Sequence, residues 1–199
     1  MKQLTFKQYK QIDLTLICIL TAVFEYITTV ATARWFNLQA MAVSITITMT
    51  CIAMFRWGAA AIFTSIIGSA AYCFALGAEA KYFVIYCGGS LMCLAALPIL
   101  KALGKEKTRL SFLKRSVFAV AAYLSFIIGR WLFSLIFEFR FDSFIRFIST
   151  DVLSLLFVIV VLALLKNVDG MIEDQKAYLF RLERERLAKE SSPNENNFQ

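Results

Sequence analysis

The sequence contains no histidine, and it has only two prolines and eight glycines among its 199 residues. Without histidine, the usual general base and the commonest metal ligand are missing, so a Ser-His hydrolase and an H-E-x-x-H zinc protease are excluded. No G-x-x-x-x-G-K-[ST] motif is present, which excludes nucleotide hydrolysis through a P-loop. We therefore expect a protein that is not an enzyme and that holds no metal or cofactor. If the protein moves a solute across a membrane, the energy must come from a partner protein or from an ion gradient.

The composition indicates a membrane protein. Hydrophobic residues make up 59% of the chain, whereas soluble domains carry about 45–50% apolar residues. The apolar runs are continuous and contain few helix breakers, which favours helices over a β-barrel with its period-two alternation. The net charge is +7, and the basic residues lie at the ends of the apolar runs. We therefore expect this charge to face a lipid bilayer and not nucleic acid.

Six apolar segments approach the roughly 20 residues that a transmembrane helix needs. The predicted fold is an all-α integral membrane protein, with a six-helix transmembrane bundle in residues 1–166. A signal peptide ending near residues 31–33 is a weaker alternative, because the first apolar stretch is long for that role and contains Glu25. The predicted spans are residues 14–36, 38–55, 59–77, 82–100, 116–137 and 147–165.

The basic residues predict the orientation of the bundle. Most of them lie at the N-terminus, after the second and fourth segments, and in the C-terminal stretch. The positive-inside rule places this side in the cytoplasm, and an even number of spans then leaves both termini there. We expect a multi-pass protein of the cell membrane. The opposite side carries only Arg34, Lys81, Arg140 and Arg146.

The chemistry of the chain changes after the last apolar segment. Residues 167–190 are predicted to form a cytoplasmic amphipathic helix, and the polar residues 191–199 a disordered tail. Acidic and basic residues are balanced in this helix, which does not suit an anionic-lipid anchor. Two interpretations stay open, namely a solvated extension of the sixth span or a contact for a cytoplasmic partner.

Four charged residues fall in the middle or outer half of the predicted spans: Glu25, Arg34, Arg130 and Asp151. Each buried charge costs about 2.5–3.5 kcal/mol on insertion scales, so it needs a partner or a purpose. One interpretation is an ion pair of Arg130 with Asp151 that only locks two helices together. The other is that Arg130 or Arg34 binds an acidic group of a small solute. Glu25 or Asp151 would then hold the arginine or accept a hydrogen bond from the solute.

Several weaker candidates accompany these charges. Tyr86 can stack on a flat ligand, while Gly88 and Gly89 allow close approach by a ligand or by a neighbouring helix. The five cysteines lie in apolar segments without C-x-x-C spacing, so we expect buried thiols. Small residues four apart favour close helix packing, within one protein or against a partner. These residues are Cys18 and Ala22 in the first span, and Ala61, Ser65 and Ser69 in the third.

Four short stretches carry a resemblance that spans nearly the whole chain. They read QYKQIDL at residues 8–14, MFRWG at 54–58, STDVLS at 149–154 and VDGMIEDQKAYL at 168–179. With six short helices and cytoplasmic termini, the chain resembles the substrate-binding S component of energy-coupling factor (ECF) vitamin transporters. Within that family it is similar to a group whose substrate is unassigned.

The resemblance implies a subunit that binds a vitamin or related micronutrient near its outer face and topples in the membrane to release it inside. It implies an ECF transmembrane scaffold subunit and two ATPase subunits as partners. Family members contact the scaffold through A-x-x-x-A in the first helix. This chain lacks that pattern, and Cys18-x-x-x-Ala22 is its nearest small-residue equivalent. We therefore expect a binding subunit of an ATP-driven importer. A membrane scaffold or regulatory subunit that binds proteins, and a stand-alone gradient-driven transporter, stay open as alternatives.

Overall fold

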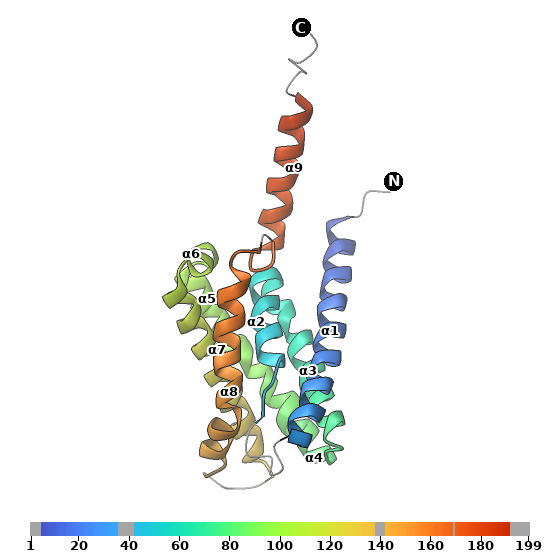
Figure 1. The fold of residues 1–199 in the computed structure, drawn as a ribbon, viewed down its shortest axis with the longest axis vertical. Helices are drawn as coiled ribbons and strands as arrows, with labels where there is room; N and C mark the ends of the chain where they lie inside the picture. The colour runs from blue at the N-terminus through green and yellow to red at the C-terminus, as the bar shows by residue number, and fades with distance from the viewer. Residues whose placement is uncertain (1–4, 36–41, 138–141, 169, 192–199) are drawn as a thin grey trace.

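The computed structural model describes residues 5–35, 42–137, 142–168 and 170–191. Every regular element in these ranges is helical, and the helices form one elongated bundle (Figure 1). Helix α1 (Phe6–Trp35) begins at the end of the bundle from which α9 (Gln175–Ser191) projects (Figure 1). We call this the terminal end, and the opposite end, where α1 finishes, the distal end.

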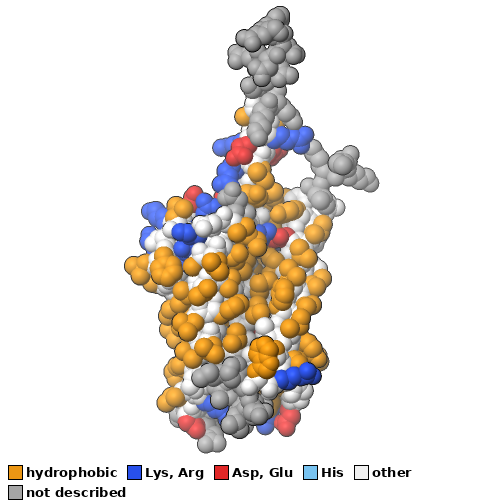
Figure 2. Space-filling view, viewed as in Figure 1, with side chains coloured by type: hydrophobic (Ala, Val, Ile, Leu, Met, Phe, Trp, Pro, Cys, Tyr) orange, Lys and Arg blue, Asp and Glu red, His pale blue; other side chains and the backbone are white. Residues whose placement is uncertain are grey.

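Five helical stretches are long and apolar enough to cross a membrane. Hydrophobic side chains cover the middle of the bundle in Figure 2, and charged side chains gather toward its ends. The predicted all-α, multi-pass membrane fold is therefore confirmed by helix length and hydropathy. The count of six spans is not, because predicted segments two and three fall in one stretch. The five stretches are Phe6–Trp35, Thr46–Ala75, Ala80–Leu103, Phe112–Ser134 and Asp142–Leu165.

The stretch that contains predicted segments two and three consists of two short helices, which we call arms. Helix α2 (Thr46–Trp57) has 12 residues and α3 (Ala61–Ala75) has 15, which gives lengths of about 18 and 22 Å against about 30 Å of hydrocarbon. Between them lies the 3₁₀ turn η1 (Gly58–Ala60), where Gly58 has φ +61°, a conformation that glycine adopts without penalty. Each arm alone is shorter than a full span.

Contacts with α1 show that the chain reverses at this turn. Helix α2 runs antiparallel to α1, because its first residue lies beside the middle of α1 and its last turn beside the start of α1. Helix α3 then runs in the same direction as α1. The contacts are Glu25–Thr46 and Asp13–Arg56 for α2, and Cys18–Thr64 and Thr21–Gly68 for α3.

The predicted start of the second span is wrong. Residues 42–45 are not helical, and residues 38–41 lie outside the described ranges. The non-helical segment is held by the last long helix, α8 (Asp142–Leu165): the Ala42 amide donates to the Thr150 carbonyl at 2.9 Å, and the Ser44 amide donates to Ser154 Oγ at 2.8 Å. Non-helical backbone is tolerated at membrane depth only where the protein itself satisfies it, as these bonds do.

The stretch 80–103 is helical but irregular. It consists of α4 (Ala80–Phe83), the π-helical turn η2 (Val84–Gly88), the 3₁₀ turn η3 (Leu91–Ala95) and α5 (Ala96–Leu103). Pro98 has no N–H, and its ring crowds the carbonyl four residues earlier, which favours a break just before it. Such departures from α-helix often accompany functional sites.

Helix α7 (Phe112–Ser134) packs directly on the backbone of this irregular stretch. A Cβ atom added to Gly129 would overlap the carbonyl of Gly89, and one added to Gly89 would overlap the backbone of Arg130. Gly88 faces the ring of Phe133 in the same way. Of the two uses predicted for Gly88 and Gly89, the structure shows close approach by a neighbouring helix.

The segment between α8 and α9 is fastened to the terminal end of the bundle. Arg56 pairs with Asp13 at 2.6 Å and also donates to the carbonyl of Gly170 at 2.6 Å. Ile172 and Gln175 are buried. The predicted helix over 167–190 therefore begins later, at Gln175, and its first part is a docked non-helical segment. The predicted tail 191–199 lies outside the described residues except for Ser191, which ends α9.

Acid is expected to loosen this docked segment. Lys105 Nζ lies 2.7 Å from Asp174 Oδ2. Partial burial raises the pKa of Asp174, but the hydrogen bond and charge of Lys105 outweigh burial and lower the pKa below its ordinary value of 3.8. A carboxyl whose pKa is lower in the folded state stabilises the fold above its unfolded pKa, and this contribution is lost as the pH falls through the folded pKa. The unfolding temperature of the wild type should therefore exceed that of Asp174→Asn at neutral pH, and the gap should close below about pH 4. A gap that does not change with pH would contradict this pairing.

Candidate functional site

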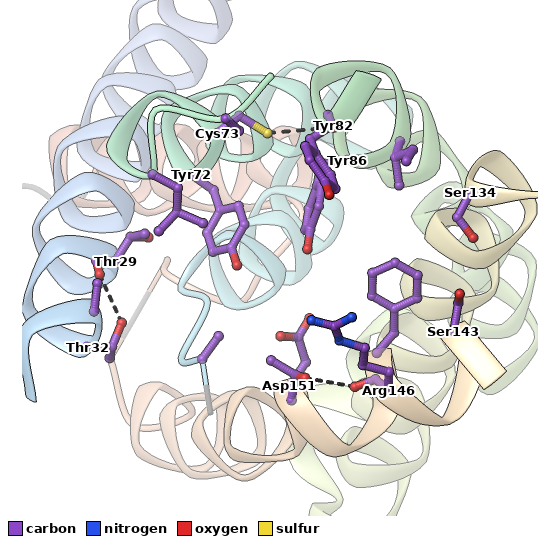
Figure 3. A pocket seen from close by; sticks show the side chains of 17 residues that line it. Thr29, Thr32, Tyr72, Cys73, Tyr82, Tyr86, Ser134, Ser143, Arg146 and Asp151 are labelled. Atoms are coloured by element: carbon purple, nitrogen blue, oxygen red, sulfur yellow. Dashed lines mark hydrogen bonds between the residues drawn. The ribbon is translucent and has the colours of Figure 1, made fainter. Parts of the chain in front are cut away.

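A cavity of about 340 Å³ opens at the distal end of the bundle. Its walls come from the end of α1, the end of α3, the α4–η2 stretch, the end of α7 and the start of α8 (Figure 3). Ligand pockets usually measure about 300–1,000 Å³, so this one suits a small molecule. These walls come from segments that lie far apart in the sequence, so no single stretch of the chain marks the whole cavity.

An ion pair between Arg130 of α7 and Asp151 of α8 lies at the base of the cavity. Arg130 Nη1 donates to Asp151 Oδ2, and the residues are only 2% and 4% exposed. The guanidinium carbon also lies 4.4 Å from the ring centroid of Tyr86 and 4.2 Å from that of Phe126, within cation–π range. The structure thus brings together the two charges singled out in the sequence. Asp151 lines the cavity, and Arg130 lies behind it.

Aromatic rings form a wall above the ion pair. The centroids of Tyr72 and Tyr86 are 5.0 Å apart with their planes tilted by 31°. Phe147 meets Tyr86 edge-on, at 6.2 Å and 85°. All three line the cavity. Tyr86 was a candidate for stacking, whereas Tyr72 and Phe147 were missed because isolated aromatic residues are common throughout apolar spans.

Arg146 of α8 extends into the cavity from its rim (Figure 3). Its guanidinium makes no hydrogen bond or ion pair with another residue in the described part of the chain. In the sequence it counted only as a basic residue of the less positive side. A signal was present, because Ser143, Arg146, Phe147 and Thr150 follow the i, i+3, i+4, i+7 spacing of one helix face, and all four line the cavity.

Thr29 of α1 contributes a polar atom without a partner. The residue is 3% exposed and lines the cavity. Its Oγ1 has no hydrogen-bond partner among the described residues, although the Thr29 carbonyl accepts a bond from Thr32 at 3.1 Å. Buried hydroxyls are rarely left unpaired, because an unmade hydrogen bond costs about 1–3 kcal/mol. Thr29 is therefore available to a bound molecule.

Glu25 lies deeper than the cavity and has another role. The Ser44 hydroxyl donates to its Oε1 at 2.9 Å, and the Thr46 amide donates to its Oε2 at 2.8 Å. Thr46 is the first residue of α2, so the carboxylate caps this helix from α1 and complements its positive end. Glu25 fixes where the α2 arm begins and so holds the adjoining segment, whose Ala42 lines the cavity.

The remaining predicted residues lie away from the cavity. Arg34 is exposed at the end of α1 and is not part of its lining. The small residues of the first and third predicted spans pack within the chain, as in the contacts of Cys18 with Thr64 and of Ser65 with Ser90, so the buried ones are not accessible to a partner. Cys18, Ala61, Ser65 and Ser69 are buried and Ala22 is half-buried. All five cysteines are free thiols.

Neither the known protein families, nor the curated proteins, nor the solved structures include a match to this chain. The site is therefore interpreted from its own geometry.

Proposed function

We propose that the chain is a membrane-embedded binding protein for a small solute, and that the distal cavity is its binding site. One observation carries this proposal: Arg146, whose guanidinium has no hydrogen-bond or ion-pair partner among the described residues, points into a cavity lined in part by aromatic rings. A purely structural ion pair between Arg130 and Asp151 would need no such space beside it. The cavity combines aromatic and other apolar side chains with several polar ones, and sites that bind small molecules use polar groups in this way to fix the orientation of the ligand.

The proposal places the distal end on the outside of the cell. The terminal end carries most of the lysines and arginines, which supports a cytoplasmic location for it and for both termini. An outward-facing site in a chain without a nucleotide-binding motif agrees with the resemblance to S components. We propose that the chain captures a vitamin or related micronutrient for an ATP-driven importer, without covalent chemistry. Its partners would be an ECF transmembrane scaffold subunit and two ATPase subunits.

A second function, a scaffold or regulatory subunit that binds other proteins, is favoured by α9. This helix projects from the bundle (Figure 1), and its apolar residues Phe180 and Leu187 are 55% and 57% exposed. Protein purification from the native membrane separates the two functions. Two ATPases and a membrane scaffold in the purified complex support the importer, whereas other partners support the alternative.

A third function, gradient-driven transport by the chain alone, is favoured by the short arm α2 with the non-helical segment before it. Discontinuous helices of this kind often surround the ion sites of secondary transporters. Uptake that persists without ATP and stops when the proton or sodium gradient is collapsed would support it.

Native mass spectrometry of the protein purified from its own membranes tests the binding function. We expect a co-purified small molecule. Thr32→Phe places a ring in the cavity whatever the charge of the solute, and it should abolish the extra mass. Ile145→Ala is the matched control, because Ile145 is 71% exposed beside Arg146 and does not line the cavity. A wild-type protein without any bound molecule, or equal occupancy in Thr32→Phe, would contradict the proposal.

A further inference from the structure

We infer that the solute is a small planar acid with one net negative charge, and this inference rests on the proposed binding function. Its acid group would lie on Arg146, and its ring against Tyr72, Tyr86 and Phe147. The carboxylate–guanidinium contact would form at the rim of the cavity, and the ring would lie deeper inside.

The charges around the cavity favour a monoanion. Asp151 is neutralised by Arg130, so Arg146 carries the excess charge among the described residues that line the cavity and their ion-pair partners. At the rim, Lys81 lies 3.4 Å from Glu79, and these two charges offset each other. A cation would be repelled by Arg146, and a dianion would keep one uncompensated charge in a partly dry site. The planar fork of arginine binds a carboxylate through two parallel hydrogen bonds.

The walls favour a flat molecule. The rings of Tyr72 and Tyr86 stack obliquely on each other, with centroids 5.0 Å apart and planes tilted by 31°. An aromatic ring that packs against this pair gains both apolar burial and aromatic contact. Figure 3 places Thr29 and Arg146 on opposite sides of the cavity. The unpartnered Oγ1 of Thr29 can donate or accept a hydrogen bond. A molecule with its acid group at one end and a polar atom at the other would satisfy both residues.

The volume limits the size of this molecule. At about 340 Å³, the cavity is near the lower limit for ligand pockets. One or two fused rings with a short acid arm would fill it. A lipid headgroup shares the anionic chemistry of the proposed solute, but a phosphate ester has no ring to place against the aromatic wall.

Matched pairs of probes test the inference. Benzoate, 2-naphthoate and indole-3-acetate are each compared with the corresponding neutral amide by isothermal titration calorimetry on the detergent-solubilised full chain. We expect each acid to bind about tenfold or more tightly than its amide, since a charge-assisted hydrogen bond is about twice as strong as a neutral one. Cyclohexanecarboxylate, which has the charge without the flat ring, should bind more weakly than benzoate.

Variants of Arg146 test whether this residue causes the preference for acids over amides. Arg146→Gln should remove the preference for acids over amides, and Arg146→Lys should keep part of it, because lysine retains the charge without the fork. Arg146 is exposed, and its guanidinium makes no hydrogen bond or ion pair with another described residue, so both variants should unfold at the wild-type temperature. Ile145→Ala again serves as the control and should keep the full preference.

The outcomes separate this inference from the proposed function. Equal affinity for acids and amides, no binding of any acid, or unchanged acid affinity in Arg146→Gln overturns the planar-acid inference. Native mass spectrometry presupposes no charge on the solute. A neutral molecule or a lipid that is found there and lost in Thr32→Phe would leave the binding function standing and the planar acid refuted. An empty cavity in that experiment refutes both.

Discussion

Replacing Asp151 with alanine is expected to lower the free energy of unfolding by about 3–5 kcal/mol, as for other buried ion pairs that lose one partner. The guanidinium of Arg130 would remain in the bundle, 2% exposed, without its carboxylate. It lies behind the wall of the cavity, and the rings of Tyr86 and Phe126 offset only part of the cost of an unpaired buried charge. The loss should be visible as a lower midpoint in heat or SDS unfolding of the purified protein.

A double variant distinguishes a lost ion pair from a general defect. Arg130→Met with Asp151→Leu replaces both charges by apolar side chains of similar length and should recover most of the stability that the single variant loses. Arg34→Ala, at an exposed position outside the cavity, should change stability by less than about 0.5 kcal/mol. A double variant as unstable as Asp151→Ala would show that the pairing is not the source of the loss. Solute binding by the stable double variant then tells whether Asp151 only locks α7 to α8 or also contacts the ligand.

The cost of a charge in the membrane was enough to predict that Arg130 and Asp151 matter. Their depth follows from the apolar segments around them, and opposite charges at similar depth predict a pair. The same argument predicted that Glu25 matters, but it did not predict that Glu25 caps α2. Its partners belong to residues 44–46, where a non-helical segment enters α2, and hydropathy does not distinguish a buried extended segment from a helix.

The helix boundaries also show that hydropathy cannot predict features that depend on tertiary contacts. Apolar length predicted the long helices α1, α7 and α8, because each segment is surrounded by polar residues that end it. It did not predict that α2 has only 12 residues or that the stretch 80–103 contains π and 3₁₀ turns. Those features depend on contacts with other helices, such as the backbone contact between Gly89 and Gly129. One sequence carries little information about such tertiary contacts.

The cavity itself was the least predictable part of the site. Arg146, Tyr72 and Thr29 lie near the ends of three different helices, and nothing local marks them as neighbours. A basic residue at the end of a span is ordinarily a topology signal. Only the packing of α1, α3 and α8 around a common space turns Arg146 into a candidate ligand contact.

Gly129→Ala is expected to destabilise the bundle by about 1–3 kcal/mol, the usual range for an overpacked interior. In an open helix the same change would be favourable, since alanine forms helices about 1 kcal/mol better than glycine. At Gly129 the effect on stability changes sign because the added Cβ would overlap the carbonyl of Gly89. A backbone atom cannot rotate away from such a clash as a side chain can. To make room, α7 must move away from the irregular stretch 80–103. Arg130 is the next residue in the chain, so this movement should also disturb the base of the cavity and weaken solute binding.

Gly88→Ala provides the matched control for this close backbone contact. Its added Cβ would meet the ring of Phe133, a side chain that is half-buried and can rotate away. The unfolding midpoint should therefore fall less for Gly88→Ala than for Gly129→Ala, and solute binding should change less as well. If the two variants lost equal stability, or if Gly129→Ala unfolded at the wild-type temperature, the backbone contact between α7 and this stretch would not be what holds Arg130 in place. The position of Arg130 would then depend on Asp151 and the aromatic rings alone.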